Sequence, residues 1–303
     1  MVLFIARRLF SMLLVTLAIV FFGYLGMNMI DNWEGEDPGY HLLEDSRAAA
    51  ADSVAYLGDL LRGDLGEVPS QGNLREVTDI LKTAYGNSAG LLAMALGGAT
   101  LLGLLVGSLA ALSRRGGREY ALLLGTIVGV SMPSFLIALL LQQGGILYTR
   151  TMGTRLVSMG GYAWDFQHLA MPLVVLAARP VAYLTRAAYL ALGRIMTEDY
   201  IRTAFAKGLS QTRVVLNHAL RNFAVPFLTS VGVSLRFSLS TLPLVEFIFA
   251  WPGLGFHILQ AIQRRVPILV VTIALAFGVT IQLVSLLLDV AYTLIDPRIG
   301  ALE

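Results

Sequence analysis

Six long stretches of mostly apolar residues alternate with shorter polar segments along the chain. A helix that crosses a lipid bilayer needs roughly 20 mostly apolar residues, and each of these stretches reaches that length. The pattern therefore predicts six membrane-spanning helices. They occupy residues 9–30, 88–112, 120–147, 169–190, 223–249 and 268–294.

The composition agrees with this pattern. Of the 303 residues, 56% are hydrophobic and 14% are charged, and the mean hydropathy is +0.71, whereas soluble domains have about 25% charged residues. So few polar side chains cannot cover the surface of a soluble protein of this size, and lipid must cover the rest. This excludes a soluble enzyme, a disordered regulator and a nucleic-acid binder, and it predicts an all-α polytopic membrane protein.

Basic residues predict the orientation, because short cytoplasmic loops are enriched in lysine and arginine. Arg7 and Arg8 precede the first helix, which is too long for a signal peptide and has no small-residue cleavage site after it, so we interpret it as a retained anchor. More basic residues fall between the second and third helices, between the fourth and fifth, and after the sixth. Both termini are therefore expected in the cytoplasm. The residues concerned are Arg114, Arg115 and Arg118, then Arg194, Arg202, Lys207, Arg213 and Arg221, and finally Arg298.

The segment between the first two helices is acidic. Residues 31–86 carry twelve of the twenty acidic residues and four basic ones, a balance of −8. We expect this segment to lie outside, to form small helices over the outer mouth, and to be interrupted at Gly63, Gly66, Pro69 and Gly72. The chain then divides into a first helix with the acidic segment (1–86), a transmembrane domain of five helices (87–294) and a short cytoplasmic tail (295–303).

Several kinds of chemistry are missing from the sequence. A P-loop needs lysine directly after glycine, but Lys82 follows leucine and Lys207 follows alanine, so any ATP must be bound by another chain. There are no cysteines, and the four histidines are scattered rather than spaced as metal ligands. Ser131 lacks the final glycine of a serine-hydrolase elbow. We expect no catalytic residue, no metal ligand and no bound cofactor on this chain, which is not an enzyme.

The cytoplasmic loop at residues 194–226 is the most informative segment. Thr197, Glu198 and Asp199 form a typical helix start, with acids in the first turn. The helix that follows is amphipathic, and on pattern alone it either lies on anionic lipid or docks on another protein. Small residues at 204, 206 and 208 would permit a close approach. One face is predicted to carry Ile201, Ala204, Phe205 and Leu209, and the other Arg202, Lys207 and Arg213.

Residues 199–210 (Asp-Tyr-Ile-Arg-Thr-Ala-Phe-Ala-Lys-Gly-Leu-Ser), with residues 218–222 and Pro226, resemble the EAA loop of ABC-importer permeases, and more narrowly that of the dipeptide/oligopeptide/nickel-type family. Pro226 follows Gly208 by eighteen residues, which is the peptide-type spacing. Arg202 and Thr203 replace the usual glutamate and alanine, so a glutamate-specific contact is not implied. Further similar stretches lie at residues 62–66, 131–135, 249–255 and 288–298, and the opening at 4–9 is similar to the first of the two usual permease subunits.

The resemblance implies a mechanism and a set of partners. In this family, two permease chains form the pore above two ATP-binding-cassette ATPase subunits, which hold the ATP and Mg²⁺. A separate extracytoplasmic binding protein delivers the solute. The short helix in the loop is implied to dock on an ATPase subunit as a coupling helix. A heterodimer with a second permease chain, contact with lipid and no contact with nucleic acid are expected. The implied docking residues are Tyr200, Ile201, Arg202, Thr203, Ala204, Lys207, Gly208, Leu209 and Ser210.

Five charged residues fall inside the predicted helices, where a charge costs at least ~2.5–3.5 kcal/mol at the bilayer centre. One of them, Arg186, is expected close enough to the cytoplasmic face to extend its charged end into water. Glu246 and Asp289 fit the family pattern, which implies shared structural roles. Arg179 and Arg236 stand where that pattern implies small or apolar residues. Together with Glu246 they are candidates for the translocation path, where cations would suit a solute carrying carboxylate or phosphate. Alternatively, the two arginines pair with acids of the partner permease.

We therefore expect a permease subunit of an ATP-driven, binding-protein-dependent importer in a bacterial or archaeal plasma membrane. Di- or oligopeptides are the expected solutes, and the resemblance leaves nickel, glycosides or another small solute open. The alternative is an ion-gradient-driven secondary transporter. Such carriers show inverted repeats and broken helices, neither of which is evident in this sequence.

Overall fold

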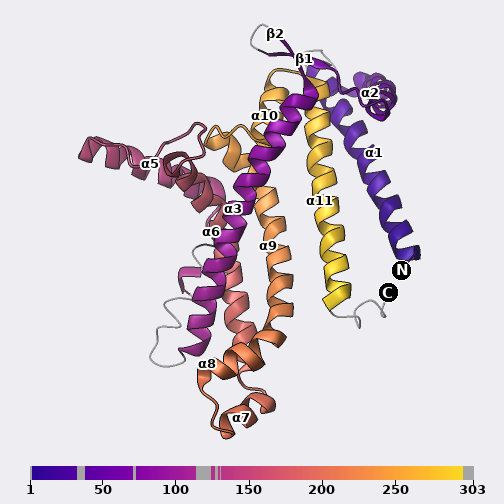
Figure 1. Ribbon diagram of the computed structural model, residues 1–303. Helices are drawn as coiled ribbons and strands as arrows, with labels where there is room; N and C mark the ends of the chain where they lie inside the picture. Colours follow the sequence, from indigo (N-terminus) through magenta and orange to yellow (C-terminus); the bar gives the residue numbers. More distant parts are fainter. Residues whose placement is uncertain are drawn as a thin grey trace. The chain divides into compact units, whose positions relative to one another are not determined.

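The computed structural model describes residues 2–32, 38–70, 73–113, 124–126, 129 and 131–295, most of which are helical. Figure 1 shows the order of the elements. Their bounds are α1 Val2–Asn32, α2 Pro38–Leu61, β1 Glu67–Ser70, β2 Asn73–Glu76, α3 Val77–Leu112, α5 Ser134–Met152, α6 Phe166–Ile195, α7 Asp199–Ala206, α8 Gln211–Val214, a π-helix Val215–Ala219, α9 Leu220–Ile248, α10 Leu254–Gln263 and α11 Pro267–Ile295.

Five helical segments of the described chain are long and apolar enough to cross a membrane. This confirms the prediction of an all-α polytopic membrane protein. The third predicted span, residues 120–147, falls partly outside the described residues, and its described end belongs to α5. The five segments are Ala6–Asn32, Val77–Leu112, Phe166–Ile195, Gln211–Ile248 and Pro267–Leu288.

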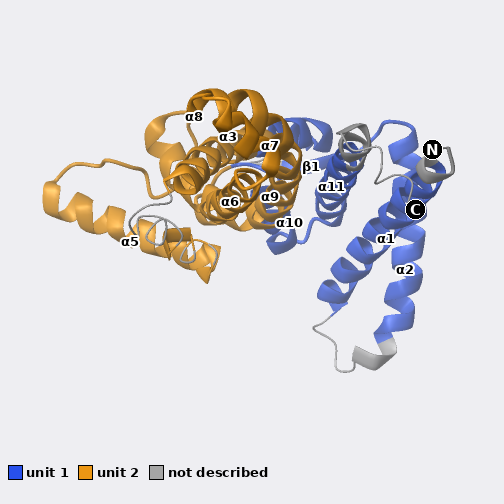
Figure 2. Cartoon of the chain, turned by 90° about the horizontal axis from the view of Figure 1, so that it is seen from below, with its two compact units in different colours: residues 1–88, 252–289 blue, residues 89–251, 290–303 orange. Residues whose placement is uncertain are grey.

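The chain forms two compact units, which Figure 2 distinguishes by colour. Unit 1 comprises residues 1–88 and 252–289, and so contains α1, α2, the two strands, the first turns of α3, α10 and most of α11. Unit 2 comprises residues 89–251 and 290–303, with the rest of α3, α5, α6, α7, α8 and α9. The candidate sites predicted in the cytoplasmic loop and on the fourth and fifth spans all belong to unit 2.

In unit 1, α1 and α2 pack with α11 through aromatic and small residues. The Tyr24 ring meets the Tyr56 ring edge-on at 6.0 Å between centroids. The hydroxyl of Tyr56 lies 3.1 Å from that of Thr272, within hydrogen-bond distance. Gly23 is close to α11, since a Cβ added there would lie 2.9 Å from a methyl carbon of Val271. The face of α2 that carries Tyr56 is thus fixed on the membrane helices.

The acidic segment differs from its prediction of several small helices. It forms one helix of 24 residues, α2, followed by the antiparallel hairpin β1–β2, in which Glu67 pairs with Glu76. The alanine-rich run at residues 48–51 favours continuous helix, which explains the single long element. The predicted interruptions at Gly63 and Gly66 are confirmed, because their φ angles of 79° and 74° are ones that glycine adopts without steric cost.

In unit 2, α3 approaches α6 closely through two glycines. A Cβ added at Gly103 would lie 2.6 Å from the Cβ of Leu184, and one added at Gly107 would lie 2.6 Å from the Cβ of Ala188. Glycines four residues apart share one helix face, and small residues there let two membrane helices pack backbone to backbone. This contact fixes α3 against the second half of α6.

The start of α6 is set by Asp165, which has an extended backbone and accepts a hydrogen bond of 2.9 Å from the backbone N–H of His168. That bond, and the approach of His168 Nδ1 to 2.8 Å, hold the pKa of Asp165 below its ordinary value. From this cap, α6 runs 30 residues and shares the most extensive helix interface of the described chain with α9.

We predict that Gly103→Leu disrupts the packing of α3 on α6, because its side chain would overlap Leu184. Overpacking of this kind costs about 1–3 kcal/mol or more, so the thermal unfolding temperature of the purified protein in detergent should fall clearly. The matched control is Gly97→Leu in the same helix, since a Cβ at Gly97 meets nothing within 4 Å. Equal losses of stability in the two variants would contradict the assigned contact.

Candidate functional site

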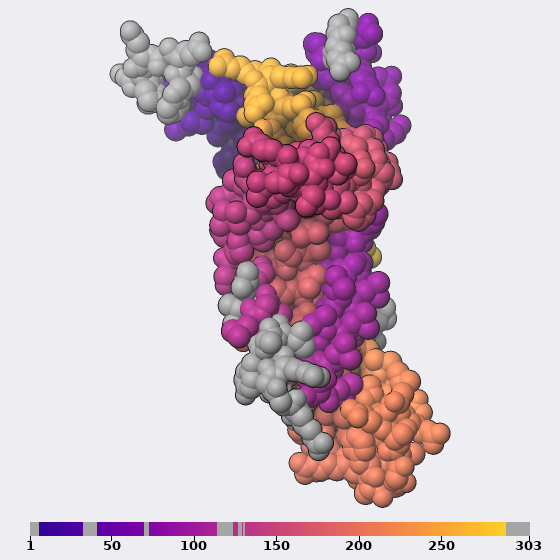
Figure 3. Space-filling view, turned by 90° about the vertical axis from the view of Figure 1, so that its left-hand side faces the viewer, coloured from indigo at the N-terminus to yellow at the C-terminus, as the bar shows by residue number. Residues whose placement is uncertain are grey.

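The loop between α6 and α9 folds into a compact helical segment, which protrudes at the lower end of unit 2 in Figure 3. Its first helix, α7, begins after Glu198, whose backbone is extended, as the helix-start pattern predicted. Asp199 in the first turn lies 3.5 Å from Arg202, and its carbonyl accepts a hydrogen bond of 2.9 Å from the Thr203 hydroxyl. These contacts are local, so they define α7 but do not fix it in space.

Two buried side chains fix α7 to the rest of unit 2. Ile201 is fully buried and Ala204 is 4% exposed, and both belong to a core that includes Leu184 and Leu192 of α6 and Phe223 of α9. The amide of Asn222 also donates a hydrogen bond of 2.9 Å to the Tyr200 hydroxyl. The helix is therefore held by residues of both α6 and α9.

The predicted inward face of α7 is correct at Ile201 and Ala204 and wrong at Phe205, whose exposed fraction is 41%. The small Ala204 makes the close contact with the core, and Phe205, one residue further round the helix, falls outside it. Leu209 is half-buried, and the basic residues Arg202 and Lys207 are exposed, as predicted.

Gly208 ends the helix. Its φ of 79° lies in the left-handed region, which disfavours residues with a Cβ. Its amide donates a hydrogen bond of 2.9 Å to the carbonyl of Phe205. A Cβ there would meet nothing within 4 Å, so within this chain the backbone angle, and not crowding, accounts for glycine at 208.

The predicted docking residues thus divide into two groups. Ile201 and Ala204 face the core of unit 2, while the others lie wholly or partly at its surface. The surface group consists of Tyr200, Arg202, Thr203, Lys207, Gly208, Leu209 and Ser210.

A π-helix at Val215–Ala219 joins α8 to α9, so that residues 211–248 form one continuous helical segment. The amide of Leu220 donates to the carbonyl of Val215, five residues earlier. The residue pattern of the loop did not predict this element. Single π-turns within α-helices are frequent at functional sites.

The charged residues predicted inside the membrane occupy different environments. Glu246 is completely buried inside unit 2, away from any exposed face. Arg179 and Arg236 are exposed on unit 2, and the Arg179 guanidinium lies 4.9 Å from the centre of the Phe237 ring. The side chain of Asp289 lies outside the described residues.

An aromatic cluster lies at the carboxyl end of α9, in a stretch that the sequence marked only by its resemblance to the family. Trp251 is fully buried and meets Tyr162 and Trp164 at centroid distances of 4.9 and 5.0 Å. The amide of Gly161 donates a hydrogen bond of 2.8 Å to the carbonyl of Phe249. The chain has three tryptophans, and two of them belong to this cluster. Their positions were the one sequence feature that could have indicated it.

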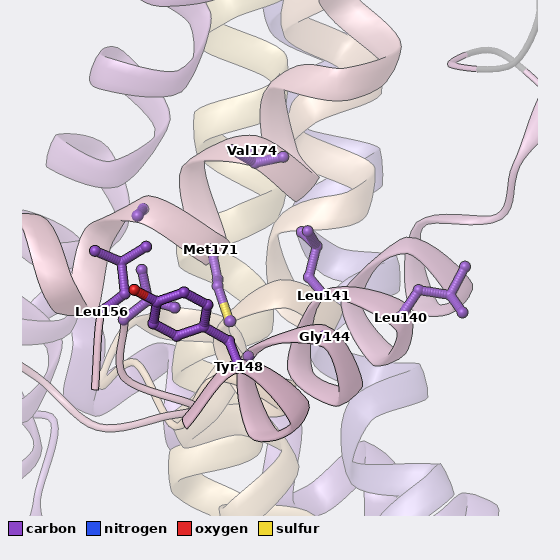
Figure 4. A pocket seen from close by; sticks show the side chains of 10 residues that line it. Leu140, Leu141, Gly144, Tyr148, Leu156, Met171 and Val174 are labelled. Carbon is purple, nitrogen blue, oxygen red and sulfur yellow. The ribbon is translucent and has the colours of Figure 1, made fainter. Parts of the chain in front are cut away.

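An apolar pocket of about 350 Å³ lies between α5, the 153–165 segment and α6. Figure 4 shows Tyr148, Leu156 and Met171 gathered around one part of it. Its lining residues carry no charged side chain, and the hydroxyl of Tyr148 is their one polar side-chain group, so the pocket is poorly suited to recognise a charged solute. The lining residues are Leu140, Leu141, Gly144, Gly145, Tyr148, Leu156, Val157, Ala170, Met171 and Val174.

Comparisons with known proteins find relatives over most of the chain. The family described as "Binding-protein-dependent transport system inner membrane component" matches residues 103–301. The dipeptide transport system permease protein of Haemophilus influenzae is 35% identical over 266 residues, which cover 80% of this chain and 79% of that protein. The protein of the same description from Bacillus subtilis is 33% identical, covering 81% and 78%. The glutathione transport system permease protein of Escherichia coli O6:H1 is 31% identical, covering 80% and 77%.

We predict that Trp251→Ala destabilises the chain strongly, since truncating a buried tryptophan costs about 3–5 kcal/mol. Trp164→Ala is the matched control, because Trp164 belongs to the same cluster but its exposed fraction is 48%. Thermal unfolding in detergent should show a clearly larger loss for Trp251→Ala. Equal losses would show that the cluster is not organised around the buried ring.

Proposed function

Because the chain belongs to the family of binding-protein-dependent transport system inner membrane components, we propose that it is one permease subunit of an ATP-driven importer of di- or oligopeptides. The peptide assignment is supported by the relatives, which are named as dipeptide and glutathione transport system permeases. It is also supported by the peptide-type spacing of Gly208 and Pro226.

The observation that supports the proposal best is that α7 is exposed on one side and packed into the core of unit 2 on the other. A coupling helix must expose one surface to an ATPase and be fixed through the other to the helices that it moves. On α7, Arg202, Thr203 and Lys207 are exposed, while Ile201 and Ala204 are buried in the core shared by α6 and α9. A force applied to the exposed surface would therefore reach both membrane helices through packed side chains.

The complete importer then contains more chains than this one. We assign ATP and Mg²⁺ to two separate ATPase subunits, solute capture to an extracytoplasmic binding protein, and the other half of the pore to a second permease chain. Both termini of this chain would lie in the cytoplasm. Exposed apolar residues along α5 support contact with lipid or with the second permease. They are Phe135, Leu136, Leu139, Leu140, Ile146 and Leu147.

We predict that Ala206→Trp prevents docking of the ATPase without unfolding the chain. Ala206 is exposed at the end of α7 and has an ordinary helical backbone, so a bulky side chain there is tolerated by the fold but obstructs a partner. The unaltered chain, purified in mild detergent from its native membrane, should bring along an ATPase with a P-loop and a second permease. The variant should retain the permease and lose most of the ATPase, as measured by mass spectrometry and ATP hydrolysis.

The matched control is Thr151→Trp, which adds the same side chain at an exposed position of α5 and should leave ATPase recovery unchanged. Full recovery of the ATPase with Ala206→Trp would remove α7 from the docking surface. Purification of the unaltered chain alone, or only with copies of itself, would contradict the importer, and transport driven by an ion gradient would then be tested in vesicles.

A further inference from the structure

Three arginines lie on one exposed face of α6. Arg179, Arg186 and Arg194 are seven and eight residues apart, which is close to two helical turns for each interval. All three side chains are exposed on unit 2. At 1.5 Å per residue the row is about 22 Å long, and it runs from the middle of α6 to the end that leads into α7. We call these residues the arginine row.

Most of the arginine row lies in a segment that crosses the membrane. Arg179 is the fourteenth of the 30 residues of α6, about 20 Å from its first residue, and thus near the bilayer centre. An arginine facing lipid at that depth is strongly disfavoured. The exposed face must therefore meet either water or another protein.

Within the described chain, the arginine row has no acidic partner. Ion pairs among the described residues include Arg62 with Asp59, His168 with Asp165, Arg202 with Asp199 and Arg265 with Asp31. None of them involves the row or Arg236, which is exposed on α9 next to Phe237. Within the described bounds of α6 and α9 the only acid is Glu246, which is fully buried, so the exposed arginines of these helices create a positive potential that attracts mobile anions.

The setting of Arg179 leaves its hydrogen-bond donors available. Its guanidinium lies over the Phe237 ring, which in turn meets the Tyr183 ring edge-on at 5.6 Å. Contact with an aromatic face restrains a guanidinium, and its N–H groups, which form no hydrogen bond with the described residues, can still take a carboxylate in a bidentate manner. The packing on Phe237 thus restrains the Arg179 guanidinium, and it leaves the positive charge available to bind an anion.

We propose that the arginine row and Arg236 line the solute path and bind the carboxylate of the passing solute. This inference rests on the proposed function, since a peptide importer must carry at least one carboxylate per solute through the membrane. The row provides cations at intervals of about 10–12 Å, from the bilayer centre to the end of α6. Each carboxylate is therefore stabilised along the half of the membrane that precedes release.

The absence of cysteine in this chain allows a direct test in the assembled importer. Tyr183→Cys places one thiol between Arg179 and Arg186, and its labelling is measured with an anionic and a cationic water-soluble methanethiosulfonate. We expect the thiol to react, and to react faster with the anion. Adding Arg179→Gln or Arg186→Gln should lower the ratio of the anionic to the cationic rate by about threefold or more. The ratio cancels changes in the reactivity of the thiol itself.

Leu105→Cys is the matched control, because Leu105 is 58% exposed among other exposed leucines of α3 and should face lipid and remain unlabelled. Leu190→Cys, exposed between Arg186 and Arg194, repeats the test if Tyr183→Cys impairs folding. An unreactive thiol at both positions would show that the row is covered by a partner chain. A rate ratio unchanged by loss of the arginines would also overturn the proposal.

The chemistry of the solute is tested separately. Trialanine should slow labelling of the thiol at 183, and trialanine amide, which lacks the carboxylate, should slow it several-fold less. Equal protection by the two compounds would exclude carboxylate recognition. Recovery of the ATPase is measured on the same preparation, independently of labelling. Loss of the ATPase would contradict the importer assignment, whereas an unchanged labelling ratio with the ATPase present would contradict the role of the arginine row.

Discussion

The packing of α6 against α9 is the contact on which the rest of unit 2 depends. Gly103 and Gly107 bring α3 close to the face of α6 that carries Leu184 and Ala188, and the α7 segment rests on the core at the far ends of both helices. In a membrane the hydrophobic effect does not drive helices together, because lipid tails are as apolar as the side chains. Helix association depends instead on close van der Waals contact, which small residues permit. The remaining face of α6, which is exposed, carries the arginine row.

Much of the fold was predictable from the sequence, because long apolar stretches in a chain with 14% charged residues permit few structures other than membrane helices. Prediction failed where local pattern and tertiary packing disagree. The alanine-rich acidic segment forms one long helix rather than several, since propensity extends it and burial of Tyr56 holds it. Phe205 has helical spacing from Ile201, yet the contact is centred on the smaller Ala204.

The candidate sites were partly predictable for a related reason. Residue types identified the loop at 194–226 and the membrane-embedded arginines, but spacing alone did not show that Arg179, Arg186 and Arg194 share an exposed face, because the direction of that face depends on how α6 packs with α3 and α9. Glu246 was grouped with the arginines as a charge within a span, and its complete burial became evident only from the fold.

The π-helix at Val215–Ala219 has a mechanical consequence. A π-turn contains more residues per turn than the α-helix on either side, and its hydrogen bonds can be exchanged for those of an α-turn with a small rotation of the flanking segments. This element lies between the short α8 and the membrane-crossing part of α9. A load applied at α8 would therefore be taken up in part as twist at 215–219 before it reaches α9.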